Sequence, residues 1–357
     1  MTRDYSQFFG AGSAGLPKQE LSPLVRLGWQ SVFAQQTDVD ELAATPPCRV
    51  VEVHRSGLRV AGDGFATEIP PGPEATVGDW LLFNPDQPQR SRVLDRKSLL
   101  KRRAAGHERK EQLIGANIDT AFIVTSCNAD FNLAQLERYV ALSMETQITP
   151  VILLTKADLS DDPAPYLADA RSISDRITVL ALDARGDEAR SALAPWCKPG
   201  QIIAFLGSSG VGKSTLTNAL SETAQAATQS IREDDARGRH TTSHRQLHIT
   251  GTGCAVLDTP GMRELQLTDA STGLEETFAD LAALAASCRF NDCAHDTEPG
   301  CAVQAGLETG AIDRDRLTRW RKLLAEEAFN SATLAQRRAK DRAFGKMVRG
   351  IVKENRK

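Results

Sequence analysis

A glycine-rich stretch in the second half of the chain has the residue types and spacing of a phosphate-binding loop. It reads Gly207-Ser208-Ser209-Gly210-Val211-Gly212-Lys213-Ser214 and matches G-x-x-x-x-G-K-[ST] in full. Glycines permit positive φ, so backbone N–H groups can converge on phosphate oxygens. Lys213 is expected to reach the β- and γ-phosphates, and the Ser214 hydroxyl to bind Mg²⁺. The stretch therefore predicts a nucleoside triphosphate site that extends to Thr215.

Two shorter motifs indicate the base and the reaction. Asp258-Thr259-Pro260-Gly261 fits D-x-x-G, in which the aspartate holds Mg²⁺ through water and the glycine N–H contacts the γ-phosphate. Thr155-Lys156-Ala157-Asp158 fits [NT]-K-x-D, whose aspartate accepts hydrogen bonds from guanine N1–H and N2–H₂, a pair that adenine lacks. Together with the phosphate loop they predict a GTPase. A P-loop kinase or ATPase is the alternative, and competition between GTP and ATP separates the two.

Four potential metal ligands lie within fourteen residues, as Cys288-x₄-Cys293-x-His295-x₅-Cys301. Three thiolates and one imidazole complete a tetrahedral zinc shell with no open position, which is typical of a structural site. Unligated buried cysteines are the alternative. The other cysteines are scattered, mostly in apolar runs, and are predicted to be buried small hydrophobes: Cys48, Cys127, Cys197 and Cys254.

The elements that must position these motifs are visible in the apolar pattern. Near-continuous apolar runs at Ala121–Thr125, Val151–Thr155, Ile177–Leu182 and Ile202–Leu206 alternate with helix-like segments such as Leu133–Gln147. This alternation predicts a parallel sheet covered on both faces. Two further strands are predicted, at Arg245–Thr250 and Cys254–Leu257, and a helix over Ser214–Leu220. An α/β P-loop GTPase domain is therefore expected over residues 113–267.

The segments on either side have different patterns. Short alternating runs between Cys48 and Arg103, separated by turn residues, predict an OB-like barrel over residues 45–112. Residues 1–44 are predicted to be a partly mobile extension with one amphipathic stretch, Leu24–Gln36. Residues 268–357 are predicted to form a helical domain that holds the zinc cluster and ends in a basic tail.

The order of the motifs along the chain is unusual. Thr155 precedes Gly207, whereas in ordinary small GTPases the guanine-reading motif follows the phosphate loop. The same site can form if the fold is circularly permuted. With this order, and with Arg237-Gly238-Arg239-His240-Thr241-Thr242 before the D-x-x-G motif, the chain resembles the circularly permuted GTPases of small ribosomal subunit biogenesis, the RsgA family. The resemblance covers about residues 45 to 330.

The resemblance implies GTP hydrolysis stimulated by the 30S subunit, late in its maturation, with 16S rRNA as a contact. It places Asp183-Ala184 near guanine O6, where the family usually has Ser-Ala, and favours Thr242 over Thr241 as an Mg²⁺ ligand. Met262 follows D-x-x-G where Ras-like proteins carry glutamine, so another residue must orient the attacking water. His240 is the candidate, and a role in shaping the switch or contacting RNA is its alternative.

The net charge of −3 conceals two basic segments. Residues 90–112 carry nine Lys/Arg against three Asp/Glu, and residues 308–357 carry fourteen against seven. These segments could contact RNA phosphates, in which case association depends strongly on salt. Alternatively they are solvated surface, and the chain is a regulatory GTPase that docks on a protein partner.

Nothing in the sequence indicates a membrane. No apolar run approaches the roughly 18 residues that a spanning helix needs. The segment Met1–Gly15 lacks a basic region followed by an apolar core, so it is not predicted to be a signal peptide. We therefore expect a cytoplasmic protein without membrane contact, and a monomer.

Overall fold

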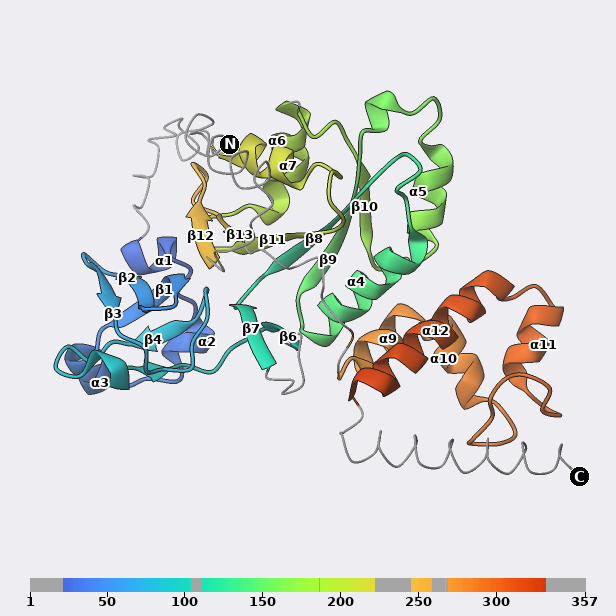
Figure 1. Ribbon diagram of the computed structural model, residues 1–357, viewed down its shortest axis with the longest axis horizontal. Coiled ribbons are helices and arrows are strands. Elements are labelled where there is room, and N and C mark those ends of the chain that lie inside the picture. Colours follow the sequence, from blue (N-terminus) through green and yellow to red (C-terminus); the bar gives the residue numbers. More distant parts are fainter. Residues whose placement is uncertain are drawn as a thin grey trace, which may run out of the picture.

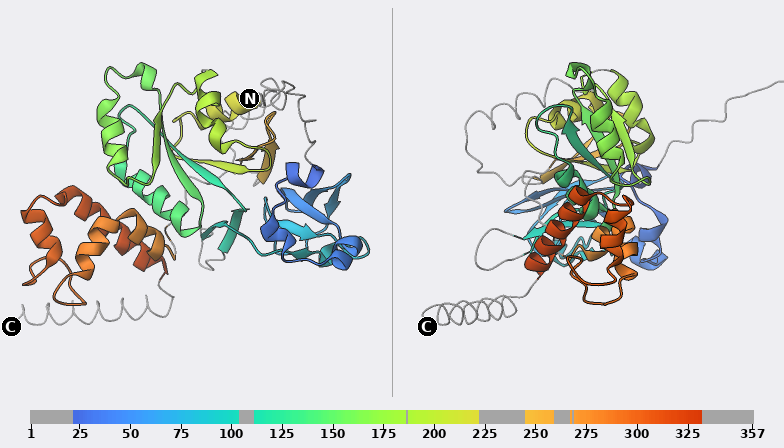
Figure 2. Two further views of the ribbon diagram at one scale, coloured as in Figure 1. Left: turned by 180° about the vertical axis from the view of Figure 1, so that it is seen from behind. Right: turned by 90° about the vertical axis from the view of Figure 1, so that its right-hand side faces the viewer.

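The computed structural model describes residues 22–103, 111–185, 187–221, 245–258, 267 and 269–331. Figures 1 and 2 show the strands of an N-terminal unit and the helices of a C-terminal unit at opposite ends of a central α/β sheet. Among the described residues, no helix has the length and apolar character that crossing a membrane requires.

The central sheet is mostly parallel, as predicted. Its order is β10-β9-β8-β11-β13-β12, and only β12 at the end of this order runs antiparallel to its neighbour. The strands are β8 (Thr120–Ser126), β9 (Thr149–Thr155), β10 (Thr178–Ala181), β11 (Ile202–Leu206), β12 (Arg245–Ile249) and β13 (Ala255–Asp258). Every residue of β8 and β11 is buried, because helices cover both faces of a parallel sheet.

Alternate side chains of each strand enter different cores. On β8, Ile123 belongs to the core under α4 (Leu133–Glu145) and α5 (Ala164–Arg171). Phe122 belongs to the core under α6 (Asp187–Leu193) and α7 (Lys213–Leu220), where it stacks on Phe205 of β11 with ring centroids 5.5 Å apart. The two cores fix β8 and β11 side by side at the centre of the sheet.

The N-terminal strands form an antiparallel set in the order β3-β2-β1-β4-β5, which suits a partly open OB-like barrel. They are β1 (Pro47–His54), β2 (Gly57–Gly62), β3 (Ala66–Ile69), β4 (Trp80–Leu82) and β5 (Arg92–Val93). Cys48, Val50, Val60 and Leu81 fill the interior. A separate two-stranded sheet, β6 (Leu99–Arg103) and β7 (Glu111–Ala116), lies beside the last turn of α4 (Figure 1).

Residues 22–44 form three short helices against the barrel strands. The predicted amphipathic stretch is divided into α1 (Pro23–Arg26) and α2 (Ser31–Ala34), and α3 (Val39–Ala44) follows. The ring of Trp29 meets the buried ring of Trp80 edge-on, with centroids 4.8 Å apart. Aromatic packing of this kind adds to the burial of apolar surface, and it holds the segment between α1 and α2 against β4.

Strand β1 of the barrel also pairs with β12 of the central sheet. Glu52 lies opposite Gln246 and Val53 opposite Arg245, and the Gln246 side-chain amide donates to Glu52 Oε1 over 2.8 Å. The barrel and the central sheet are therefore one continuous hydrogen-bonded sheet. Strand β12 begins directly after residues 222–244, which contain the predicted switch residues and lie outside the described part of the chain.

The C-terminal unit consists of helices that pack on α4. They are α9 (Ser271–Thr277), α10 (Ala279–Ala286), α11 (Ala302–Glu308) and α12 (Arg314–Ser331). A side chain at Gly273 is excluded because its Cβ would lie 2.0 Å from the Ala141 carbonyl oxygen of α4. The Gly273 N–H donates to Glu145 Oε2 over 2.8 Å, so α9 is held against the last turn of α4.

Candidate nucleotide and metal sites

The predicted nucleotide motifs gather at one edge of the central sheet. Because β9, β10, β11 and β13 are parallel, their carboxyl ends lie at the same edge. Thr155 ends β9, Gly207 follows β11, and Asp258 ends β13. Adjacent β8 and β11 divide the sheet into two runs of strands, and α/β sheets bind ligands at such a point.

The phosphate loop has the backbone that its glycines permit. Gly207, Gly210 and Gly212 have φ of 140°, 77° and 98°, and a Cβ at Gly207 would lie 2.2 Å from the Val124 carbonyl oxygen. Buried Val211 anchors the loop to the core, whereas Ser209, Gly210 and Ser214 are exposed. The tip of the loop at Ser209 and Gly210 is therefore open to solvent, and helix α7 begins directly behind it.

Lys213 is held over this loop by the loop itself. Its Nζ donates to the carbonyl oxygen of Gly207 over 2.9 Å and to that of Ser208. The Ser208 hydroxyl in turn donates to Gln135 Oε1 of α4 over 2.9 Å. The ammonium group is therefore positioned at the start of α7, where the helix dipole favours anions.

Thr155 connects the predicted base-reading loop to the phosphate loop. Its buried hydroxyl lies 2.6 Å from the carbonyl oxygen of Val211 and 3.0 Å from that of Thr125. Lys156 then adopts a left-handed φ of 57°, and a 3₁₀ turn over Ala157–Leu159 presents the Asp158 side chain. The Thr155 hydroxyl thus bridges the base-reading loop and the phosphate loop.

Arg185, which the sequence analysis missed, links Asp158 to Asp183. Arg185 donates Nη2 to Asp158 Oδ2 over 2.6 Å and Nε to Asp183 Oδ1 over 3.1 Å. Hydrogen bonds from the side chain and backbone N–H of Arg185 hold the pKa of Asp183 below its ordinary value. Ala184, which lies between Asp183 and Arg185 in the sequence, is buried. The only signal in the sequence was that an arginine follows two residues after Asp183.

The remaining predicted residues on the hydrolysis side are outside the part of the chain that the structure describes. They are His240, Thr241, Thr242 and Gly261, together with the side chain of Asp258. The backbone of Asp258 is described, and it pairs with Gln246 in the register of β12 and β13.

The four predicted metal ligands come together in the C-terminal unit. The ligand atoms of Cys288, Cys293, His295 and Cys301 all lie within 4.8 Å of one another. Cys288 Sγ is 3.4 Å from His295 Nδ1 and 3.8 Å from Cys301 Sγ. Zinc bonds of tetrahedral geometry require ligand separations of about 3.5–3.8 Å, so the side chains fit one zinc ion.

The surrounding residues orient these ligands. His295 has a left-handed φ of 59°, and its carbonyl oxygen accepts from Gln304 Nε2 and from Arg321. The Cys301 sulfur caps α11 by accepting from the Gln304 N–H over 3.5 Å. Glu298 accepts the backbone N–H groups of Ala294 and Asp296, which lower its pKa to about 2. This network closes the loop around the cluster, as expected for a structural metal site.

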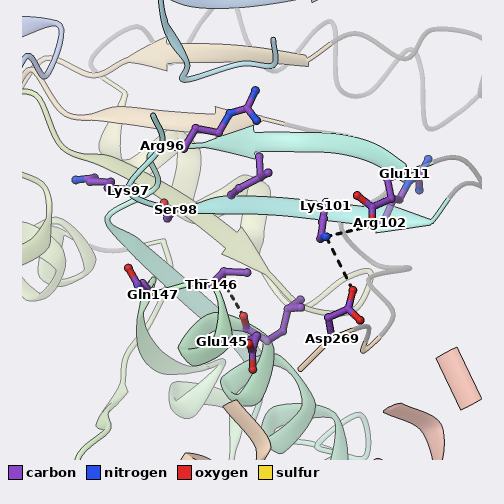
Figure 3. A pocket seen from close by; sticks show the side chains of 12 residues that line it. Arg96, Lys97, Ser98, Lys101, Arg102, Glu111, Glu145, Thr146, Gln147 and Asp269 are labelled. Carbon is purple, nitrogen blue, oxygen red and sulfur yellow. Dashed lines mark hydrogen bonds and ion pairs between the residues drawn. The ribbon is translucent and has the colours of Figure 1, made fainter. Parts of the chain in front are cut away.

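A cavity of about 460 Å³ lies elsewhere, between β6, β7, the end of α4 and Asp269 (Figure 3). Lys101 points between two carboxylates there, with its Nζ 3.1 Å from Glu111 Oε1 and 4.0 Å from Asp269 Oδ2. Arg96 and Lys97, also at its wall, pair with Asp79 and Asp119. The described lining contains none of the predicted nucleotide or metal ligands, so this cavity is distinct from both sites.

Comparisons with known proteins agree with this geometry. A family model described as RsgA GTPase matches residues 93–268. The chain is 48% identical over 339 residues to small ribosomal subunit biogenesis GTPase RsgA 2 of Vibrio parahaemolyticus, covering 94% of each protein. It is also 48% identical over 316 residues to small ribosomal subunit biogenesis GTPase RsgA of Mesorhizobium japonicum, covering 86% of this chain and 91% of that protein.

Two solved structures are similar in fold. YjeQ from Thermotoga maritima aligns with a TM-score of 0.58 at 24% identity, over 78% of this chain and 97% of that chain. YloQ, described as a circularly permuted GTPase, aligns with a TM-score of 0.54 at 24% identity, over 81% and 97%. At this identity the likeness concerns the fold alone, and it confirms the permuted arrangement predicted from the motif order.

Proposed function

Because this chain belongs to the RsgA family and is therefore a GTP hydrolase, we propose that the 30S ribosomal subunit stimulates its GTPase activity, late in the maturation of that subunit. The observation that carries this proposal is its 48% identity, over nearly its whole length, to a relative named as a small ribosomal subunit biogenesis GTPase. We also propose that it works as a cytoplasmic monomer that contacts 16S rRNA through its basic segments.

The pairing of β1 with β12 supports a coupling between RNA contact and hydrolysis. OB-like barrels commonly bind nucleic acid. Strand β12 follows directly on the segment that contains His240 and Thr242, so any shift of the barrel acts on the end of that segment. Met262 cannot orient water, and we assign that role to His240, whose neutral imidazole can accept a hydrogen bond from water at cellular pH.

Phosphate binding is assigned to the backbone N–H groups of residues 207–215 and to Lys213. Ser214 is exposed in the first turn of α7, beside Lys213, where its hydroxyl could serve as a ligand to Mg²⁺. We propose that it holds Mg²⁺ together with Thr242, and that Asp258 acts through water. Mg²⁺ bound with the nucleotide neutralises charge that develops on the phosphates.

We also propose that the chain is divided into four segments. Residues 1–44 form the extension, 45–112 the barrel, 113–267 the permuted GTPase domain, and 268–357 the domain that carries one structural zinc and the basic tail.

The central test is GTP turnover by the zinc-replete protein with isolated ribosomal subunits. We expect slow turnover by the protein alone, because no glutamine follows the D-x-x-G motif to orient the attacking water. We expect strong stimulation by 30S subunits and none by 50S subunits. The variant His240→Ala should bind GTP normally and lose most of the stimulated rate. Absence of stimulation in a protein that binds GTP would contradict the ribosomal assignment and direct attention to a protein partner.

Guanine recognition has its own test at Asp158. An amide in Asp158→Asn cannot accept both guanine donors, so GDP affinity should fall about 10- to 100-fold, the loss of one hydrogen bond to a charged group. The same amide can donate to the O2 carbonyl of xanthine, so affinity for xanthosine diphosphate should rise. Calorimetric titration with both nucleotides measures the exchange. Unchanged GDP affinity would remove Asp158 from the base site.

A further inference from the structure

The structure pairs the predicted guanine-reading carboxylate with a cation of the same chain. Arg185 Nη2 lies 2.6 Å from Asp158 Oδ2, a distance typical of a strong charge-assisted hydrogen bond. Asp158 is expected to give this same carboxylate to guanine N1–H and N2–H₂. The arginine therefore occupies Oδ2, one of the two acceptor atoms that the base requires.

Asp183 provides the anchor that keeps this arginine in place. Its Oδ1 accepts the backbone N–H of Arg185 over 2.9 Å and Nε over 3.1 Å, and its Oδ2 lies 3.3 Å from Nη2. Asp183 thus makes three contacts with Arg185, and Asp158 makes one. If Nη2 leaves Asp158, the guanidinium remains bound to Asp183 and close by.

The two members of the Asp158–Arg185 pair differ in how firmly they are held. Asp158 is carried by a rigid turn, since Thr155 is buried and hydrogen-bonded to Val211. The side chain of Arg185 is 63% exposed, so it can swing into solvent without disturbing the core. Displacement of the arginine by a base consequently needs only a side-chain rotation.

We propose that Arg185 is an intramolecular competitor of guanine: it neutralises Asp158 in the nucleotide-free protein and must be displaced before the base is read. This inference rests on the proposed role of Asp158. The Asp183–Arg185 pair then sets guanine affinity below what the site could reach, and favours release of the product nucleotide. Adenine lacks the donor pair for Asp158, so the competition lowers affinity for guanine nucleotides selectively.

The decisive variant removes the competitor together with its anchor. Asp183→Ser/Arg185→Ala leaves the net charge unchanged, and it does not leave Asp183 as an additional unpaired carboxylate next to Asp158. We expect GDP to bind about two- to fivefold tighter than to the wild-type protein at low salt, the ratio that an exposed ion pair supports. At about 1 M salt, where the Debye length is near 3 Å, the ratio should approach one. ADP affinity should not change.

Arg176→Ala is the matched control, because it removes an exposed arginine from the turn before β10. It should leave GDP affinity at the wild-type value. The proposal is overturned if the double variant gains nothing at low salt, if Arg176→Ala gains as much, or if ADP gains equally. A wild-type protein that does not prefer GDP to ADP would instead overturn the guanine assignment of Asp158, so the two failures are distinguishable.

Discussion

Removal of zinc should unfold the loop of residues 288–301 and α11 while nucleotide binding survives. Binding of structural zinc provides on the order of 10 kcal/mol to small domains, far more than the few side-chain contacts of this loop can replace. The nucleotide motifs lie on the central sheet and share no residue with the cluster. Cys288→Ser should therefore lose the metal and the protection of α11 from hydrogen exchange, with GDP affinity close to that of the wild-type protein.

The measurement combines metal content with local exchange. We expect one zinc per wild-type chain, and Trp320 fluorescence should respond to its removal because the Trp320 and His295 rings lie 5.7 Å apart. Cys197→Ala serves as a control, since Cys197 is a buried thiol remote from the cluster in sequence and outside it. A Cys288→Ser protein with full zinc content, or with unchanged exchange in α11, would contradict the structural role.

Loss of the Glu137 carboxylate should loosen the C-terminal helices from α4. Glu137 is fully buried, and its Oε2 accepts from Arg319 Nε of α12 over 2.8 Å while Arg316 lies 3.5 Å from Oε1. Burial raises the pKa of Glu137, and the Arg319 hydrogen bond acts in the opposite direction. Glu137→Ala would leave Arg319 without its counter-ion, at a cost of about 3–5 kcal/mol.

A neighbouring pair gives a matched comparison. Arg138, the next residue of α4, pairs with Glu326 of α12, and this half-buried pair, with side chains 37% and 26% exposed, is expected to contribute less than the fully buried one. Hydrogen exchange of α12 should therefore rise strongly in Glu137→Ala and little in Arg138→Ala. Glu137→Leu/Arg319→Leu should recover part of the loss, because no buried charge remains unpaired. Equal effects of the two single variants would refute this account.

Local sequence patterns were sufficient to predict the strands that position the nucleotide motifs. The apolar runs predicted β9 and β11 correctly at their carboxyl ends, and parallel pairing then brought Thr155 and Gly207 to one edge. The zinc ligands could be predicted because they are close in sequence. The helix predicted over Leu133–Gln147 ends two residues earlier, at Glu145. The cause is local, because Gln147 has a left-handed φ of 58°.

Partnerships between distant segments could not be predicted in this way. The pairing of Glu52 with Gln246 depends on how the barrel sits on the sheet, and periodicity within either strand does not encode it. The burial of Glu137 depends on arginines that α12 supplies from far along the chain, and the sequence of α4 alone does not encode them. Arg185 was missed because its role depends on Asp158, which belongs to a different loop.

The permuted order also determines how the site is made during synthesis. Strands β8, β9 and β10, with Asp158 and Asp183, are complete before β11 and the phosphate loop are translated. Until then β8, whose residues are all buried in the finished protein, is an apolar edge strand, the type of surface on which chains aggregate. Arrival of β11 covers that edge and adds the phosphate loop, and β11 is then the open edge until β13 pairs with it. Nucleotide binding by a nascent chain would thus report that synthesis has passed β11 and that β11 has paired with β8.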